Sequence, residues 1–555
     1  MIPSQLLDQR PLVWVAAGAL VLLTVVAQLS SLGTPDMGLF LYLAGRLLGG
    51  ARLYRDIIET NPPAIIALNL SVVLTARALG VSEFAVYRLA SAAALVAVLL
   101  LCRHLLRAYV APDHARFRRV LLFALVFLLF PLAGEDFGQR EHFVLAAFLP
   151  YLLLVAARAR GAVAPRGLGV GVGLLAGTGL ALKPHYGLLL GGVELWRLLQ
   201  RSNRRRPLTP EAVAALGSLV AYALLIVLLL PEYVGLVAAL GPAYMAFLRV
   251  SWLGLLLLAP AVPLVLFSLL AGFAAMRRSR ERGALALLML AVAICFAVAA
   301  VQQKGLRYHF YPSVGLAVAL LVLCLAMSRP AGTLAARLYQ RATQLLLACI
   351  VLVVTGEVAR TAVDGTPADR RARDETLRLA EFVRQRARGG PVGVLSYHIA
   401  SAFPLVNYAG VPLASRFPCL WLLPASYWNE LGRDEPLQYR PPEMMPGPER
   451  YLNDAVREDL IRAQPQVLLV LRPAPDARRY FLRRLDYLEY FGRQPVLAEF
   501  FAGYQLVGAR GEYDVYERHA GPEASPTIDR ATAQRRSNIS TPIQTSPNTI
   551  KRARE

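Results

Sequence analysis

Long apolar runs alternate with short polar gaps from residue 11 to residue 358. About 20 apolar residues are enough for a helix to cross the hydrocarbon core of a bilayer. We therefore predict a multi-span α-helical membrane protein with about eleven transmembrane helices. The predicted spans are 11–31, 88–105, 119–133, 143–157, 167–182, 187–200, 211–230, 252–275, 284–301, 311–327 and 343–358.

The charged residues in the gaps fall into two classes. Every second gap contains a cluster of arginines, whereas the other gaps contain acids, lysines and histidines. Arginine-rich loops stay on the cytoplasmic side of a membrane. The N-terminus is therefore predicted to be cytoplasmic and the C-terminus periplasmic, in a bacterial inner membrane. The arginine-rich gaps are 103–119, 158–166, 197–206, 277–282 and 329–341.

The apolar stretch Ala64–Leu79 is not counted as a span. Counting it would move every arginine-rich gap to the outside, against the orientation signal. We expect this stretch to be a helix lying on the outer membrane surface or dipping into it. It belongs to a long outer loop at 32–87, in which residues 38–50 are expected to form a second surface helix.

The apolar runs end near residue 360, where the composition changes. Residues 1–360 are predicted to form the transmembrane domain, and residues 361–520 a small α/β domain on the outer side. Residues 521–555 are rich in Ser, Thr, Pro and Arg and are predicted to be a disordered basic tail. The expected elements of the α/β domain are helices at 368–388, 451–462 and 476–494 and buried strands at 391–397 and 466–472.

The composition agrees with a membrane protein, because 56% of the residues are hydrophobic and the mean hydropathy is +0.46. The formal net charge is +22, and the arginine-rich gaps with the basic tail account for most of it. Such residues contact membrane lipid headgroups, so the charge does not indicate a nucleic-acid partner. Of the cysteines, only Cys419 falls outside the predicted spans, which excludes a disulfide framework within the C-terminal domain.

The first outer loop places Asp36 just beyond the first span. A carboxylate held there can act as a base that takes a proton from an acceptor hydroxyl. The alternative is that Asp36 caps a helix beginning near Met37. Asp56 and Glu59 lie further along the loop and are interpreted either as a solvated turn or as substrate contacts.

The second outer loop carries Glu135, Asp136, Arg140, Glu141 and His142 between two apolar spans. Ionisable groups at the membrane edge are costly unless they are paired or used, so they are functional candidates by default. The alternative is a structural ion-pair cluster of Asp136 with Arg140.

Further cations are predicted at the same outer surface. Lys183 lies in a hairpin between two spans, and Lys304 and Arg307 precede the span 311–327. Several donors converging on one patch suit a phosphate or pyrophosphate whose lipid tail lies in the bilayer. The alternative is that these cations only reach outward to lipid headgroups.

Three histidines, His142, His185 and His309, fall on the same face. Their spacing matches no metal-ligand motif. No cofactor and no metal site is therefore predicted, and a bound divalent cation is the alternative.

Taken together, the motifs of the first 330 residues resemble the GT-C superfamily of polytopic glycosyltransferases. The resemblance is to glycosyltransferase family 39, which contains the protein O-mannosyltransferases and the lipid A aminoarabinose transferases. The residues that carry it are Asp36, the stretch 45–56 followed by Pro62-Pro63, the stretch 80–89, the stretch 179–184 and the stretch 304–312.

The resemblance implies a polyprenyl-phosphate-sugar donor and a set of site residues. Asp36 is the implied base and Asp136 or Glu135 the second acid. The implied phosphate ligands are Lys183, Lys304 and Arg88, and the further candidate substrate contacts are Arg307, His309, Asp56 and Arg140. The chain departs from the family by having Asp36-Met37 where Asp-Glu is common, and its C-terminal domain shows no match.

The predicted function is transfer of a sugar to an acceptor hydroxyl on a lipid, a glycan or a protein at the periplasmic face. The alternative is a flippase or transporter of lipid-linked saccharide. A transporter is expected to place ionisable groups near the middle of the membrane, whereas the predicted spans are nearly free of charge. A third alternative, an assembly scaffold or a polysaccharide ligase subunit, would leave Asp36 dispensable.

Overall fold

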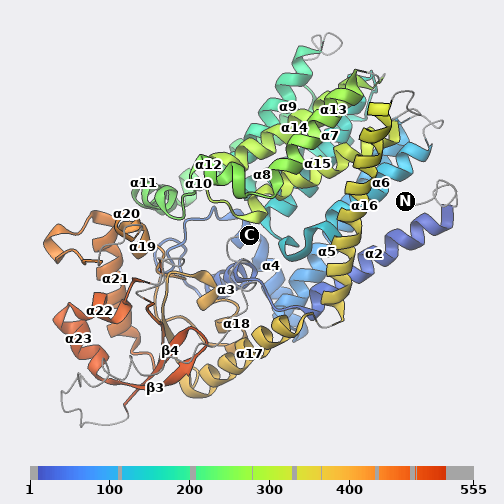
Figure 1. Cartoon of the computed structure of the whole chain (residues 1–555). Coiled ribbons are helices and arrows are strands. Elements are labelled where there is room, and N and C mark those ends of the chain that lie inside the picture. Colours follow the sequence, from blue (N-terminus) through green and yellow to red (C-terminus); the bar gives the residue numbers. More distant parts are fainter. Residues whose placement is uncertain are drawn as a thin grey trace.

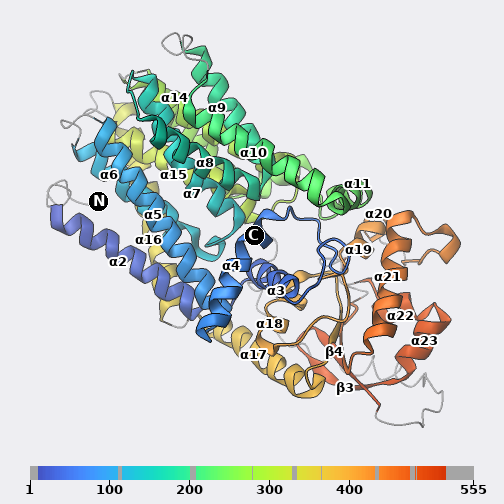
Figure 2. The same cartoon turned by 180° about the vertical axis from the view of Figure 1, so that it is seen from behind.

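The apolar runs form a bundle of long helices, and a smaller part with a β-sheet lies at one end of this bundle (Figure 1). The view from behind shows the same two parts (Figure 2). The computed structural model describes residues 10–110, 115–200, 208–277, 279, 281–327, 334–363, 365–431, 437–474, 482 and 484–519. The predicted tail at 521–555 lies outside the described residues.

The bundle confirms the multi-span membrane fold. Within the described ranges, 7 helices are long and apolar enough to cross a membrane, or 8 if the bent pair α2 and α3 is one span. Every predicted span overlaps a helix, but α8, α9 and α13 have only 17, 13 and 16 residues, so the number eleven stays a prediction. The bundle helices are α2 (Arg10–Ser30), α5 (Glu83–Tyr109), α6 (Ala115–Leu129), α7 (Arg140–Ala159), α8 (Arg166–Leu182), α9 (Gly187–Leu199), α10 (Pro210–Leu229), α13 (Ala261–Met276), α14 (Arg282–Val301), α15 (Arg307–Met327) and α16 (Leu334–Ala362).

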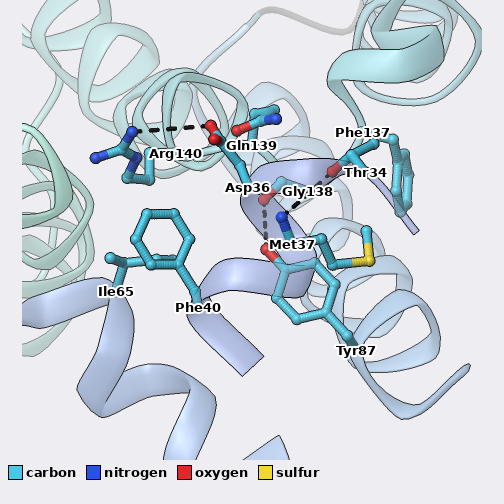
Figure 3. Close-up of a pocket in the computed structure, with 10 residues that line it drawn as sticks. All are labelled: Thr34, Asp36, Met37, Phe40, Ile65, Tyr87, Phe137, Gly138, Gln139 and Arg140. Carbon is cyan, nitrogen blue, oxygen red and sulfur yellow. Dashed lines mark hydrogen bonds and ion pairs between the residues drawn. The ribbon is translucent and has the colours of Figure 1, made fainter. Parts of the chain in front are cut away.

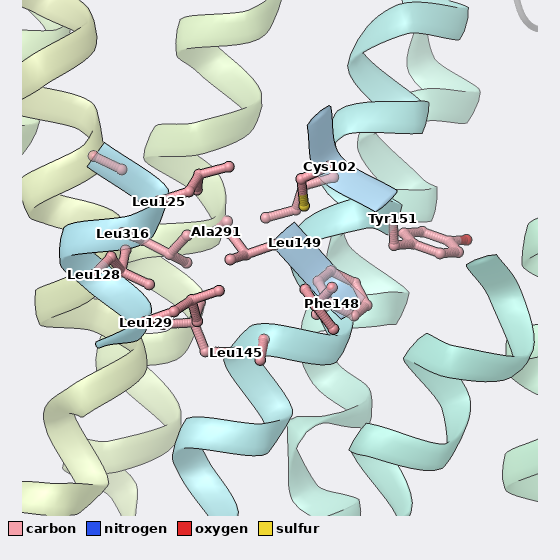
Figure 4. Close-up of a cluster of buried hydrophobic side chains, with 14 of the residues drawn as sticks. Cys102, Leu125, Leu128, Leu129, Leu145, Phe148, Leu149, Tyr151, Ala291 and Leu316 are labelled. Carbon is pink, nitrogen blue, oxygen red and sulfur yellow. The ribbon is translucent and has the colours of Figure 1, made fainter. Parts of the chain in front are cut away.

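Helices α7 and α15 form the centre of the bundle. In each, 72% of the most apolar stretch is buried, against 6% in α10 and 11% in α16. The core that surrounds them is made of leucines, alanines and aromatic side chains, some of which are drawn in Figure 4. Because neighbouring helices cover most of α7 and α15, the polar residues at the N-terminal ends of both helices are held in place.

A row of glycines lets the short helix α8 pack closely against α10. A Cβ atom at Gly173 would collide with the Glu211 carbonyl, and one at Gly177 with the Ser218 hydroxyl. Small residues four positions apart allow such close approach of membrane helices. This packing fixes the end of α8, where Lys183 follows.

Two predictions about the middle of the chain are wrong. The predicted span 252–275 is two helices, α12 (Trp252–Leu258) and α13, because Ala259 precedes Pro260 and has an extended conformation. The gap 231–251, for which no element was expected, contains the helix α11 (Pro231–Ala246).

Two further helices follow α2 in the chain. The chain bends by 70° between α2 and α3 (Pro35–Leu48), and α4 (Ala64–Leu79) packs beside α3. The predicted surface helix at 38–50 begins earlier, at Pro35, because the Thr34 hydroxyl accepts a hydrogen bond from the Met37 N–H and caps it. Thr34 is therefore the N-cap, and the interpretation of Asp36 as the cap is wrong.

The C-terminal part contains a sheet of order β1-β2-β4-β3. β1 and β2 are buried, as the sequence predicted, and they pair in parallel. β3 and β4 are an antiparallel pair that was not predicted. Its strands are β1 (Val392–Leu395), β2 (Val467–Leu471), β3 (Tyr504–Arg510) and β4 (Tyr513–Arg518), and its helices are α17 (Pro367–Ala387), α18 (Leu405–Ala409), α19 (Leu422–Ser426), α20 (Trp428–Leu431), α21 (Gly447–Ala463), α22 (Tyr487–Gly492) and α23 (Pro495–Ala502).

Of the helix expected at 476–494, the described residues contain only the shorter helix α22 (Tyr487–Gly492). Helix α22 begins only after Asp486, whose carboxylate accepts hydrogen bonds from the N–H groups of Leu488 and Glu489. An aspartate that caps in this way starts a helix. Residues 475–481 and 483 lie outside the part that the structure describes.

The C-terminal part holds helix α3 through polar contacts. The Tyr408 hydroxyl accepts a hydrogen bond from the Gly33 N–H (3.0 Å), and the Asn407 amide donates to the Gly38 carbonyl (3.0 Å). The Tyr42 hydroxyl accepts from the Leu413 N–H (2.8 Å). The C-terminal part and the outer loop that carries Asp36 therefore lie at the same end of the bundle.

Candidate active site

A small pocket lies where the first turn of α3 meets the start of α7 (Figure 3). The pocket is small and partly open to solvent. Its lining residues are Thr34, Asp36, Met37, Phe40, Ile65, Tyr87, Phe137, Gly138, Gln139 and Arg140.

Asp36 is the acid of this pocket. Its side chain is 20% exposed, and its Oδ2 lies 3.9 Å from Nη2 of Arg140. Oδ2 is buried and has no hydrogen-bond partner. Burial raises the pKa of the Asp36 carboxyl above its usual range, and the positive charge of Arg140 opposes this. A carboxyl with a raised pKa has a higher affinity for a proton, which suits a general base.

Arg140 is held from the opposite side of the pocket. Its guanidinium is 6% exposed, lies 5.0 Å from the centre of the Phe40 ring and donates a hydrogen bond to Oδ1 of Asn61. The Asn61 backbone N–H and side-chain amide both donate to Oε1 of Glu59, at 2.9 and 2.7 Å. Burial raises the pKa of the Glu59 carboxyl. The first outer loop and α7 therefore meet through Asn61.

A second group lies beside Arg140, at the start of α7. Nζ of Lys183 lies 2.5 Å from Oε1 of Glu141, and both side chains are buried. Nε2 of His309 lies 3.8 Å from the same oxygen. Burial lowers the pKa of the Lys183 ammonium, and the negative charge of Glu141 opposes this.

Four buried atoms of these side chains have no hydrogen-bond partner: Asp36 Oδ2, Arg140 Nε, Glu141 Oε2 and His309 Nδ1. Buried polar groups in folded proteins nearly always have a partner. Two of the four are carboxylate oxygens and two are nitrogens able to donate. Their concentration at one place marks a site that polar substrate groups or water can fill.

Glu135 and Asp136, the predicted second acids, pair with Arg307. Nη2 of Arg307 lies 3.2 Å from Oε2 of Glu135, and its Nε lies 3.4 Å from Oδ2 of Asp136. The Asp136 side chain is 12% exposed, whereas the Glu135 side chain is 57% exposed. The alternative pairing of Asp136 with Arg140 is wrong, because Arg140 faces Asp36.

Lys304 contacts the end of helix α11. Its ammonium donates to the carbonyls of Tyr244 (2.6 Å), Met245 (3.4 Å) and Phe247. Burial lowers the pKa of Lys304 to about 8, with a smaller contribution from Arg249. Lysine commonly satisfies the last carbonyls of a helix in this way. The structure gives this predicted phosphate ligand an evident structural role.

Arg88 and Asp56 lie apart from the pocket. The Arg88 guanidinium donates to the Leu32 carbonyl (2.6 Å) and the Ser31 hydroxyl (3.3 Å), at the end of α2. Asp56 has a side chain that is 45% exposed and accepts from the Arg52 N–H (2.8 Å). These contacts agree with a structural arginine and a solvated turn.

Of the three histidines, His142 has a complete set of partners. Its Nδ1 accepts from the Gly138 N–H (3.1 Å), and its Nε2 lies 3.0 Å from the Leu129 carbonyl. Over the part of the chain that the structure describes, no group of three or more His, Cys, Asp or Glu side chains is arranged to hold a metal ion.

Two residues of the site were not among the predicted substrate contacts, Asn61 and Glu141. The available signals were weak. Glu141 is an acid in the second outer loop, just before the predicted span 143–157, and Asn61 precedes two prolines in the first outer loop. Only the fold shows that these residues contact Arg140 and Lys183.

No protein-family model and no curated protein sequence matches this chain. Its structure is similar to that of ArnT from Cupriavidus metallidurans bound to undecaprenyl phosphate, with a TM-score of 0.56, 15% identity and coverage of 93% of this chain and 99% of ArnT. The chain has the GT-C fold of ArnT. ArnT in the apo state matches with a TM-score of 0.52, 16% identity and coverage of 92% of this chain and 100% of ArnT.

The arabinofuranosyltransferase AftD from Mycobacteria matches with a TM-score of 0.48 and 15% identity, over 93% of this chain and 40% of AftD. The two ArnT structures show that the chain shares the fold of ArnT. Five residues of this fold form one cluster. The first turn of α3, the start of α7, the end of α8 and the start of α15 bring together Asp36, Arg140, Glu141, Lys183 and His309.

Proposed function

We propose that this chain is an integral-membrane glycosyltransferase. It moves a sugar from a polyprenyl-phosphate-linked donor to an acceptor hydroxyl at the periplasmic face of the membrane. The observation that carries the proposal is the cluster of buried polar atoms without partners around Asp36, Arg140, Glu141 and His309, in a fold shared with ArnT, which has been solved with undecaprenyl phosphate bound.

In this reaction Asp36 is the general base. The acceptor oxygen forms a bond to the anomeric carbon of the sugar, and the bond from that carbon to the phosphate oxygen breaks. The acceptor proton passes to Asp36, and the bond electrons leave with the polyprenyl phosphate. A base that retains proton affinity, such as an aspartate whose pKa burial raises, favours this step.

Arg140 and Lys183 are the proposed partners of the departing phosphate. Nη2 of Arg140 lies 3.9 Å from Oδ2 of Asp36, and Lys183 pairs with Glu141, the residue that follows Arg140. Charge-assisted hydrogen bonds to phosphate oxygens are strong, and they strengthen as negative charge develops on the leaving group. The second acids Asp136 and Glu135 and the substrate contacts Lys304, Arg88, Arg307 and His309 stay predictions. For Asp56, the exposed side chain and its contact with Arg52 favour the alternative of a solvated turn.

The test is the variant Asp36→Asn, with Asp56→Asn as the matched control from the same loop. The purified protein in lipid nanodiscs is given undecaprenyl-phosphate-linked hexoses and pentoses together with a bacterial envelope extract that supplies acceptors. The readout is the release of undecaprenyl phosphate. Loss of a general base typically costs a factor of about 10²–10⁴ in rate, so Asp36→Asn is expected to be stable and almost inactive, whereas Asp56→Asn keeps its rate.

Normal release by Asp36→Asn would refute its role as the base. The wild-type protein would instead be a flippase if it released no undecaprenyl phosphate with any donor but moved the intact lipid-linked sugar between the two leaflets of a vesicle.

A further inference from the structure

Every polar group of Asn61 has a partner. Its N–H and its side-chain amide donate to Oε1 of Glu59, its carbonyl accepts from the Tyr54 hydroxyl (3.1 Å), and its Oδ1 accepts from Nη1 of Arg140. Two prolines follow, Pro62 and Pro63, and a residue before proline is restricted to extended conformations. Asn61 is therefore fixed in both its backbone and its side chain.

The contact with Glu59 determines which side of the Asn61 amide faces Arg140. Because the NH₂ group points to the Glu59 carboxylate (2.7 Å), the carbonyl oxygen points the other way. It binds one end of the guanidinium, and the opposite end, Nη2, lies 3.9 Å from Oδ2 of Asp36. This distance is longer than that of a hydrogen bond.

We propose that Asn61 is a positioning residue, which holds the Arg140 guanidinium beside Asp36 but prevents it from forming hydrogen bonds to that carboxylate. The proposal rests on the proposed role of Asp36 as the base. Through its contact with Arg140, Asn61 would keep the buried Asp36 ionised and still able to accept a proton.

The physical reason lies in how a carboxylate responds to a nearby cation. An opposite charge within about 4–6 Å lowers the pKa of a carboxyl by about 1–3, and hydrogen bonds to the ionised form lower it further. If the Arg140 guanidinium bound Asp36 directly, the Asp36 carboxylate would be a weak base. If the guanidinium were turned away, Asp36 would be a neutral carboxylic acid. Asn61 holds the guanidinium at a distance between these two cases.

Charged and titratable groups from all neighbouring elements act on Asp36, so the test must isolate Asn61 from them. They are Arg140 and Glu141 of α7, Lys183 after α8, Glu59 of the outer loop, Tyr87 of α5, Tyr244 of α11, Tyr308 of α15 and Cys419 of the C-terminal part. None of these residues is altered in Asn61→Leu, which keeps the size of the side chain and removes its hydrogen bonds.

The readout is the pH dependence of carbodiimide labelling at Asp36, measured by peptide mass spectrometry on the full-length protein in nanodiscs. A carbodiimide adds to a protonated carboxyl, so the labelling midpoint reports the pKa without any substrate, and the 20% exposure of the Asp36 side chain gives the reagent access. The matched control is Asn407→Leu, because the Asn407 amide also contacts α3, at the Gly38 carbonyl, but does not contact Arg140.

In Asn61→Leu the freed guanidinium is expected to close on Asp36, and the midpoint to fall by about one pH unit or more, while Asn407→Leu keeps the wild-type midpoint. An unchanged or higher midpoint in Asn61→Leu, or an equal fall in both variants, overturns the proposal.

A second pair of variants, both at Glu59, tests the proposal if Asn61→Leu does not fold. Glu59→Gln and Glu59→Leu remove the same charge, but only the glutamine retains an oxygen that can orient the Asn61 amide. The midpoint is expected to be lower in Glu59→Leu than in Glu59→Gln, and equal midpoints overturn the proposal. Because labelling needs no sugar donor, a failure here is separate from a failure of Asp36→Asn to lose sugar transfer.

Discussion

Lys183 and Glu141 form an ion pair of 2.5 Å, from Nζ to Oε1, in which the two side chains are 7% and 0% exposed. Taking two charges out of water is costly, and their mutual attraction offsets that cost only while both are present. The pair also leaves Oε2 of Glu141 without a partner. Lys183 is therefore tied to the fold more firmly than a surface cation that only reaches for a phosphate.

This pair predicts two different effects of mutation. Lys183→Met and Glu141→Gln each leave one charge buried without its partner, and each is expected to lower the free energy of unfolding by about 3–5 kcal/mol. The double variant removes both charges and is expected to recover most of that loss. Thermal unfolding of the purified variants measures this.

The double variant is expected to bind undecaprenyl phosphate more weakly than wild type, because the Lys183 cation is missing. Single variants that melt at the wild-type temperature would show that the ion pair does not form, and wild-type binding by the double variant would show that Lys183 is not a phosphate ligand.

The raised pKa of Asp36 predicts an acidic limit for sugar transfer. The base works only when ionised, so the rate falls as the pH falls through the pKa of Asp36. Burial raises that pKa above its usual value, which is about 3.9 for an aspartate in water. The acidic limb of kcat/KM is therefore expected above this value, as measured by release of undecaprenyl phosphate at a series of pH values. Asp56→Asn should leave the limb in place, and an acidic limb at or below the ordinary aspartate value contradicts the assignment.

The contacts of Lys304 predict a local effect of its loss. Lys304→Met removes the donor that three carbonyls at the end of α11 share. We expect residues 244–250 to become sensitive to limited proteolysis, while the melting temperature of the bundle changes little, because buried apolar side chains hold the bundle. Lys304→Arg, which keeps donors at this position, is the control. Equal protease resistance in Lys304→Met and wild type would show that the cap is dispensable.

The orientation of the chain can be tested with reporter fusions that are active only in the periplasm. A fusion after Ser82, which precedes α5, is expected to be active, and one after Gly161, in an arginine-rich gap between α7 and α8, is expected to be silent. A silent reporter at Ser82 would place the acids of the outer loop on the cytoplasmic side and refute periplasmic transfer.

The sequence was sufficient for the bundle and for part of the C-terminal sheet. Runs of apolar residues gave the spans, and β1 and β2 were recognisable because each is apolar on both faces. Strands β3 and β4 were missed because most of their side chains are not buried, which leaves no continuous apolar run. The break between α12 and α13 at Pro260 was not predicted, because the residues on both sides are apolar and the hydrophobic pattern does not change there.

The acids and cations of the site were predicted from their position at the outer ends of spans, but their pairing was not. Arg140 pairs with Asp36, Lys183 with Glu141, and Arg307 with Glu135 and Asp136. Each pair joins segments that are distant in the chain, and composition carries no information about which partner is nearer.

The contacts between helix α3 and the C-terminal part have a consequence for biosynthesis. The amide that binds Gly38 belongs to a residue 369 positions further along the chain, and the hydroxyl that binds the Gly33 N–H to one 375 positions away. During translation the spans enter the membrane long before residues 403–413 leave the ribosome. Helix α3 can make these contacts only after the C-terminal part has been synthesised and has folded. A chain that stops short of that point would carry Asp36 on a helix that lacks these contacts, so under the proposed function activity arises last, after synthesis is nearly complete.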